Sequence, residues 1–174
     1  MFRYKNRPTI TFELKQFSEP AEILKWMREL NVQFYVYWFE TLNGTVLKYG
    51  ESGDCESGEH GERIYRQAGH LPGYWLTGSS GYDMAQILKD FEEEYGKRLT
   101  KNEVIIRVMP MNGVMRTTIK EVCEKIERDL INEHIRTHDR PPIGNKDYET
   151  YHQWRKHMNT KQLSKFVEFG DGPN

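Results

Sequence analysis

A predicted helix over residues 115–135 carries a glutamate in a position suited to chemistry. At about 100° per residue, Glu127 falls at the edge of the apolar stripe, between Cys123 and Leu130 on one side and Ile131 on the other. A carboxylate there faces the protein, and burying it without a partner costs several kcal/mol. Glu127 therefore needs a cation, a metal ion or hydrogen-bond donors.

A second glutamate on the same helix competes for this position. Glu133 lies near the apolar stripe on the same argument, whereas Glu121 and Glu124 point more toward solvent. A glutamate at the edge of a stripe also commonly extends into water or pairs with an arginine. Periodicity alone does not choose between Glu127 and Glu133.

The strongest strand signal lies upstream of this helix. Residues 33–40 (QFYVYWFE) are dense in β-branched and aromatic side chains, and residues 45–50 (TVLKYG) follow after Asn43-Gly44, a dipeptide that favours a tight turn. The pattern predicts a β-hairpin. Taken singly, aromatic residues on one face of such a strand are more often part of the core than of an active site.

The remaining elements follow from hydrophobic periodicity and from helix-stop signals. They are a strand at 9–14, a helix at about 19–30 ending at Asn31, a loop at 51–61, a short helix at 62–71, a loop at 71–81, a helix from Tyr82 to Gly96 and a strand at 103–109. Pro141-Pro142 ends the long helix, and the tail from Asp147 carries several basic residues. The chain therefore mixes strands and helices.

Composition fits one compact domain, since 174 residues lie within the usual range of about 100–200. The net charge of −1 gives no global positive field, so a nucleic-acid surface would need local clustering of the 25 lysines and arginines. The chain has no long apolar run and no signal-peptide pattern at its start, which predicts a soluble, cytoplasmic protein without membrane contact. Cys55 and Cys123 lie far apart and indicate free thiols.

Five short segments together resemble the GIY-YIG nucleases. They are YVY at 35–37, KYG at 48–50, RIYRQAGH at 63–70, ERDLI at 127–131 and PIGN at 142–145. Their order agrees with that family, and so does the spacing of eleven residues between Tyr37 and Lys48. The first segment lacks the family's glycine, and Lys48 stands at the second signature tyrosine, which resembles restriction enzymes with lysine at that place.

The resemblance implies a role for each matched residue. Glu127 would hold one Mg²⁺ or Mn²⁺, a hard cation that prefers oxygen ligands. Tyr37 would orient or deprotonate the attacking water with help from Lys48, because a tyrosine of pKa about 10 is a poor base unless a neighbouring cation favours phenolate. Arg63 or Arg66 would clamp the scissile phosphate. His70 completes the expected catalytic set, and Tyr35 and Asn145 would contact the substrate.

The same resemblance implies the fold and the reaction. We expect an α/β (α+β) domain with a small central antiparallel sheet of three strands flanked by helices, divided into an N-terminal strand and helix extension (1–32), a GIY-YIG-like core (33–145) and a helical, basic tail (146–174). The expected function is a sequence-specific endonuclease of restriction or phage-borne type that hydrolyses double-stranded DNA, as a homodimer if both strands are cut. Two alternatives stay open: a nuclease-derived module that binds nucleic acid or protein without cutting, and a repair or recombination nickase.

Overall fold

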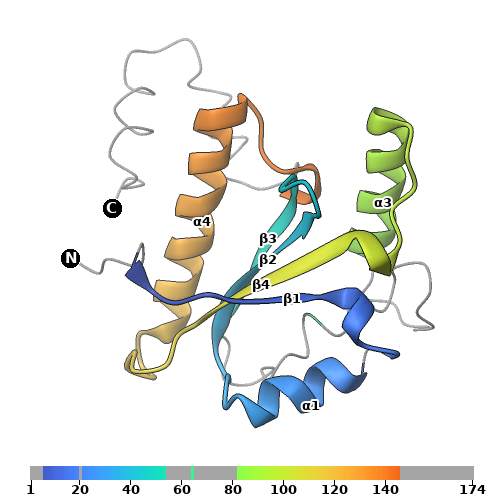
Figure 1. Cartoon of the computed structure of the whole chain (residues 1–174). Helices are drawn as coiled ribbons and strands as arrows, with labels where there is room; N and C mark the ends of the chain where they lie inside the picture. Colours follow the sequence, from blue (N-terminus) through green and yellow to red (C-terminus); the bar gives the residue numbers. More distant parts are fainter. Residues whose placement is uncertain (1–5, 20, 54–63, 65–81, 146–174) are drawn as a thin grey trace, which may run out of the picture.

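The computed structural model describes residues 6–19, 21–53, 64 and 82–145, which contain a four-stranded sheet (Figure 1). Its strands are β1 (Ile10–Glu13), β2 (Tyr35–Thr41), β3 (Val46–Ser52) and β4 (Val104–Pro110). All neighbouring strands are antiparallel and lie in the order β1-β4-β2-β3. β2 and β4 are therefore internal, whereas β1 and β3 form the two edges.

Helices cover both faces of the sheet and make a three-layer arrangement (Figure 1). The helices are α1 (Ala21–Glu29), α3 (Tyr82–Tyr95) and α4 (Ile119–His138). We call the sheet face with Tyr37 the α1/α3 face, because Tyr37 shares a core cluster with residues of both helices, and the opposite face with Val36 the α4 face. No helix in the described ranges has both the length and the apolarity to cross a membrane.

The expected central sheet of three strands is wrong, because the sheet has four strands. The segment predicted as a strand at 9–14 does form one, and it pairs with β4 through Ile10 opposite Val108 and Phe12 opposite Ile106. Phe12 lies in the same core cluster as Tyr37. The amphipathic pattern of this segment indicates a strand, but nothing local specifies a partner almost one hundred residues away.

The predicted hairpin is confirmed, although β2 begins two residues later than expected and β3 ends two residues later. Gly44 adopts a φ of +88°, the left-handed region that glycine tolerates, and the amide of Thr45 donates to Thr41 Oγ1 at 3.1 Å. β3 continues to Ser52, so Glu51 belongs to a strand and not to the predicted loop. The pairing of Glu51 with Val36 explains this extension.

A left-handed residue follows each of the three described helices, and after α3 it is Gly96 at a φ of 67°. After α1, Asn31 has a φ of 53° and the amide of Val32 donates to the carbonyl of Met27 at 3.1 Å, so the predicted stop at Asn31 is confirmed. α4 begins later than predicted, because residues 115–118 form a turn, and it extends to His138, where Asp139 at a φ of 59° ends it.

Candidate active site

The edge strand β3 brings the best-matched candidate residues together. Tyr37 pairs with Gly50 across the hairpin, and its ring lies directly over that glycine. A Cβ atom at Gly50 would lie 2.5 Å from both Cζ and Oη of Tyr37, a separation that real contacts do not show. Glycine at this position therefore allows the hydroxyl end of Tyr37 to reach across β3.

Lys48 lies on the same face of β3 as this tyrosine ring. Lys48 and Gly50 are two residues apart on one strand, so they lie on the same face of the sheet. Because Gly50 is the direct partner of Tyr37, Lys48 is a diagonal neighbour of Tyr37. The 3-10 turn η4 (Ile143–Asn145) packs against the base of the lysine: a Cβ at Gly144 would lie 2.8 Å from Lys48 Cβ. Lys48 is half-buried, and its stem is held by this turn.

Asn145 binds the outer edge of β3. Its Oδ1 accepts from the backbone amide of Tyr49 at 2.9 Å, and its Nδ2 donates to the carbonyl of the same residue at 3.1 Å. Asn145 is buried and occupies the hydrogen-bonding groups that an edge strand otherwise leaves exposed. It therefore positions the strand that carries Lys48 and Gly50.

Glu127 lies on α4 between the fully buried Cys123 and Ile131 and is half-buried, as the helical periodicity predicts. One turn before it, Cys123 is fully buried, and burial raises the pKa of its thiol to about 12, with further raising contributions from Glu51, Glu124 and Glu127 and an opposing one from Arg7. Glu51 and Glu127 thus act on the same thiol from two different elements. Glu51 of β3 and Glu127 of α4 therefore both belong to the α4 side of the sheet.

Glu51 was not among the residues expected at the site. Its Oε2 accepts from the amide of Gly53 at 2.6 Å. Gly53 in turn lies against α4, because a Cβ there would be 2.9 Å from Lys120 Cα and 3.2 Å from Cys123 Sγ. The chain after Glu51 is therefore held against the helix that carries Glu127. The alternation of residues in β3, extended by two positions, would have placed Glu51 on this face.

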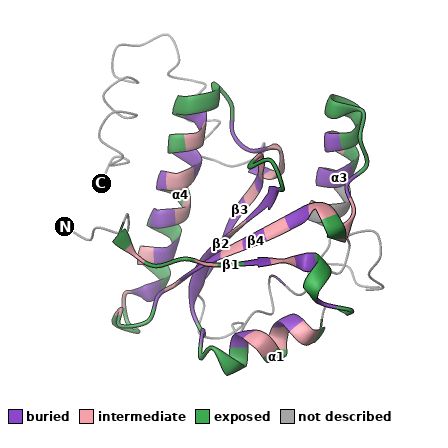
Figure 2. Cartoon of the chain, viewed as in Figure 1, coloured by how far each residue is buried: buried purple, intermediate pink, exposed green. Residues whose placement is uncertain are grey.

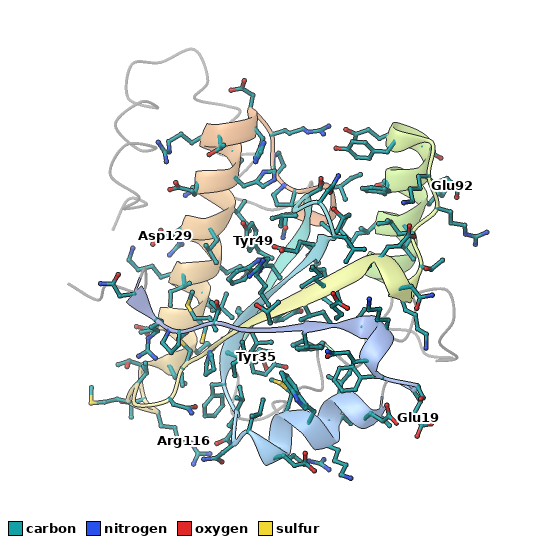
Figure 3. The ribbon with its side chains drawn as sticks, viewed as in Figure 1. Glu19, Tyr35, Tyr49, Glu92, Arg116 and Asp129 are labelled. Atoms are coloured by element: carbon teal, nitrogen blue, oxygen red, sulfur yellow. The ribbon has the colours of Figure 1, made fainter. Side chains whose placement is uncertain are left out.

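The choice between the two competing glutamates follows from where α4 meets the sheet. Glu133 is exposed and forms an ion pair with Arg136 at 2.5 Å. Tyr49 of β3, labelled in Figure 3, shares a core cluster with Ile135. The side of α4 that faces the sheet has therefore shifted around the helix axis relative to Cys123 and Ile126. Glu127 and not Glu133 is the inward-facing carboxylate.

The aromatic residues of β2 belong to the core. Tyr35, Tyr37 and Phe39 are each at most 1% exposed, and their rings follow one another at centroid separations of 5.7 and 5.9 Å. Figure 2 shows β2 as buried along almost its whole length. Tyr37 thus packs in the core while its hydroxyl lies at β3. Tyr35, expected to contact substrate, is fully buried.

Three residues of the expected catalytic set lie outside the described residues: Arg63, Arg66 and His70. The basic tail also lies outside them, and of the predicted helix at 62–71 only Ile64 is described. Ile64, which directly follows Arg63, is described, and it is fully buried in the core cluster that contains Tyr37. The chain therefore reaches the α1/α3 face at this position. That is the face on which Tyr37 and Lys48 lie.

Glu127 and Glu51 are carboxylates, the type of ligand that suits the hard cation which the GIY-YIG resemblance implies. Mg²⁺ commonly binds one or two carboxylates and keeps several waters. Among the residues that the structure describes, no group of three or more His, Cys, Asp or Glu side chains gathers at one point. A magnesium site of the kind implied requires no such group.

Comparison with known proteins adds no relative. No protein-family model, no curated protein and no solved structure matches this chain. Only the residues and contacts of the chain itself therefore bear on its function.

Proposed function

We propose that the chain is a metal-dependent DNA endonuclease of the GIY-YIG type, with its active site at the outer edge of β3. The observation that supports this most is the contact between Tyr37 and Gly50, which brings a phenol to β3 beside Lys48. Glu127 lies on α4, the helix that packs against the other face of this strand. A phenol, an ammonium and a carboxylate around one strand edge are suited to phosphodiester hydrolysis.

Each side chain has a distinct task in this proposal. Glu127, with Glu51 beside it, would hold Mg²⁺ or Mn²⁺, which when bound would stabilise negative charge on the phosphate. Tyr37 would orient or deprotonate the attacking water. Lys48 would favour the phenolate by its positive charge and donate hydrogen bonds to the phosphate. Arg63 or Arg66, with His70, would complete the set by binding the scissile phosphate.

The burial of Tyr37 sets a condition on this mechanism. The side chain is 1% exposed in the free protein, so its hydroxyl must become accessible to water when DNA binds. A substrate analogue in the site should therefore increase the reactivity of Tyr37 toward a tyrosine-modifying reagent. Modification that is unchanged by bound DNA would remove Tyr37 from the role of base.

The direct test is cleavage of supercoiled plasmid with Mg²⁺ or Mn²⁺, using DNA from varied sources. The wild-type chain should cut, and Glu127→Ala should abolish cutting. Glu133→Ala is the matched control, because Glu133 is an exposed glutamate on the same helix. Cleavage that is equal in the wild type and in Glu127→Ala, or absent from both on every DNA, would reject the enzyme proposal.

A second candidate function is a nuclease-derived module that binds without cutting, which the sealed Tyr37 and the net charge of −1 favour. Tight binding of intact duplex without cleavage would support it. The nickase alternative predicts that branched or damaged duplexes are cut in preference to intact ones. Cutting of both strands at one site calls for two active sites and hence a homodimer, which light scattering of the DNA complex would detect.

A further inference from the structure

Two histidines lie side by side in the last turns of α4, away from the proposed catalytic carboxylates. His134 and His138 are four residues apart and therefore share one side of the helix. Their ring centroids are 4.3 Å apart, and the rings are tilted by 41°. Two imidazoles at this spacing can direct a nitrogen each toward one point.

The backbone fixes which nitrogen of His134 is available. Its Nδ1 lies 2.8 Å from the carbonyl oxygen of Arg140. A carbonyl only accepts hydrogen bonds, so Nδ1 carries the proton and Nε2 keeps its lone pair. Histidines that bind metal ions usually donate their other ring N–H to a carbonyl or a carboxylate in this way, which fixes both the tautomer and the ring orientation.

Arg140, whose carbonyl oxygen orients His134, is itself held by α3 through its side chain. The guanidinium of Arg140 forms an ion pair with Glu94 and donates to the hydroxyl of Tyr95 at 2.7 Å. On its other side, the ring of His134 lies edge-on to Tyr49 at a centroid separation of 6.5 Å. The imidazole is therefore oriented by contacts from β3 and from the turn after α4. Contacts of Arg140 with α3 hold that turn in place.

We propose that His134 and His138 together bind one divalent ion of the zinc type, with Nε2 of His134 as one ligand and a ring nitrogen of His138 as the other. Imidazole nitrogen suits Zn²⁺, Cu²⁺ and Ni²⁺, whereas Mg²⁺ prefers oxygen ligands. Water would complete the coordination shell. This site differs in chemistry from the one proposed at Glu127, which lies seven residues earlier and about 10 Å away along the helix axis.

The charge state of His134 suits a metal ligand. Burial lowers the pKa of this imidazole, the hydrogen bond to Arg140 opposes that effect, and the nearby His138 and Arg140 lower the pKa further. Burial therefore favours the neutral imidazole, the form that binds a metal ion. Glu94 offsets the charge of Arg140, which reduces the repulsion that an incoming cation would meet.

The test is titration of the full chain with Zn²⁺, followed by long-range ¹H–¹⁵N spectra of the imidazoles. These spectra separate Nδ1 from Nε2 in each histidine. We expect His134 Nε2 and one nitrogen of His138 to respond at the same Zn²⁺ concentration, while Nδ1 of His134 keeps its proton. Mg²⁺ at the same concentration should leave both rings unchanged.

Two variants assign the signals and test the pairing. His138 is exposed, so His138→Gln should keep the fold and weaken the Zn²⁺ response of His134 at least about tenfold, as expected for the loss of a ligand. His134→Gln should weaken the response of His138 by a similar factor. Responses of the two rings at unrelated concentrations, no response, or an unchanged affinity of His134 in His138→Gln would each overturn the site. These outcomes do not depend on whether the chain cuts DNA.

Discussion

The two faces of β3 differ in what they offer to chemistry. On the α1/α3 face Tyr37 lies sealed among apolar side chains, with the half-buried Lys48 beside it. On the α4 face Glu51 and Glu127 are half-buried, and the charge of each raises the pKa of the buried Cys123 thiol. One face carries a phenol and an ammonium, and the other carries carboxylates.

The difference shows why an edge strand is a suitable place for such a site. Groups on opposite faces of a sheet are separated by the backbone everywhere except at an outer edge, where a ligand can contact both. Gly50 opens that edge to the ring of Tyr37, and Asn145 holds it at Tyr49. If both faces contribute to one site, changes on either face or at the edge between them should reduce cleavage.

The largest effect is expected on the α1/α3 face. Lys48→Met removes a positive charge while retaining most of the apolar stem, so the cleavage rate should fall by about 10²–10³-fold, the usual cost of a lost transition-state donor. The midpoint of urea unfolding should stay close to that of the wild type. Lys89→Met, at an exposed lysine of α3, is the matched control and should leave the rate unchanged. Full activity of Lys48→Met would show that this face contributes no charge to the reaction.

The next effect is expected at the glycine that joins the two faces. Gly50→Ala places a methyl group 2.5 Å from the Tyr37 ring, so the ring must move, at a cost of about 1–3 kcal/mol in the free energy of unfolding. Cleavage should be lost with it. Gly50→Ala combined with Tyr37→Phe should cost less than the two single changes added, because the shared clash loses one atom. Strict additivity would mean that the ring does not lie over β3.

A smaller effect is expected where Asn145 holds the edge. Asn145→Ala leaves the amide and carbonyl of Tyr49 without their side-chain partners, which should lower the free energy of unfolding by about 1–3 kcal/mol. Hydrogen exchange at the Tyr49 amide should become faster, whereas exchange at Trp38 on the internal strand should change less. Loss of cleavage with unchanged exchange would instead assign Asn145 to the substrate.

The sequence predicts the local features of this fold well. The Asn43-Gly44 turn and the helix stop at Asn31 each depend on residues within a few positions, and both are confirmed. The pairing of β1 with β4 and the contact of Asn145 with Tyr49 join segments about one hundred residues apart. No local pattern encodes such pairings, because the same amphipathic strand or polar turn could pack in several places.

In the candidate site, too, local sequence predicts some features, whereas others depend on tertiary contacts. A helical wheel places Glu127 at the edge of the stripe, but it treats α4 as if one side faced the sheet along its whole length. The structure shows that side shifting toward Ile135, which leaves Glu133 exposed. Glu51 is absent from the expected site because the predicted strand ends at Gly50, two residues before the end of β3. Both errors come from tertiary contacts that determine which residues of a regular element are buried.

The last predicted effect is a pH dependence of stability that arises from the thiol on the α4 face. Burial, followed by the charge of Glu51, raises the pKa of Cys123 from its usual 9.0 to about 12. Between these values the unfolded chain loses the thiol proton and the folded chain keeps it. The free energy of unfolding should therefore fall by about 1.4 kcal/mol per pH unit from this group as the pH rises above 9. Urea unfolding of the wild type and of Cys123→Ala should diverge by that slope.

Glu51→Gln tests whether the carboxylate of β3 reaches this thiol. Removing its negative charge should lower the folded pKa of Cys123, so the decline in stability should end at a lower pH than in the wild type. Glu121→Gln is the control, because Glu121 is an exposed glutamate on α4. Identical pH profiles for Glu51→Gln and the wild type would separate Glu51 from the α4 face and leave Glu127 as the sole carboxylate proposed for the metal.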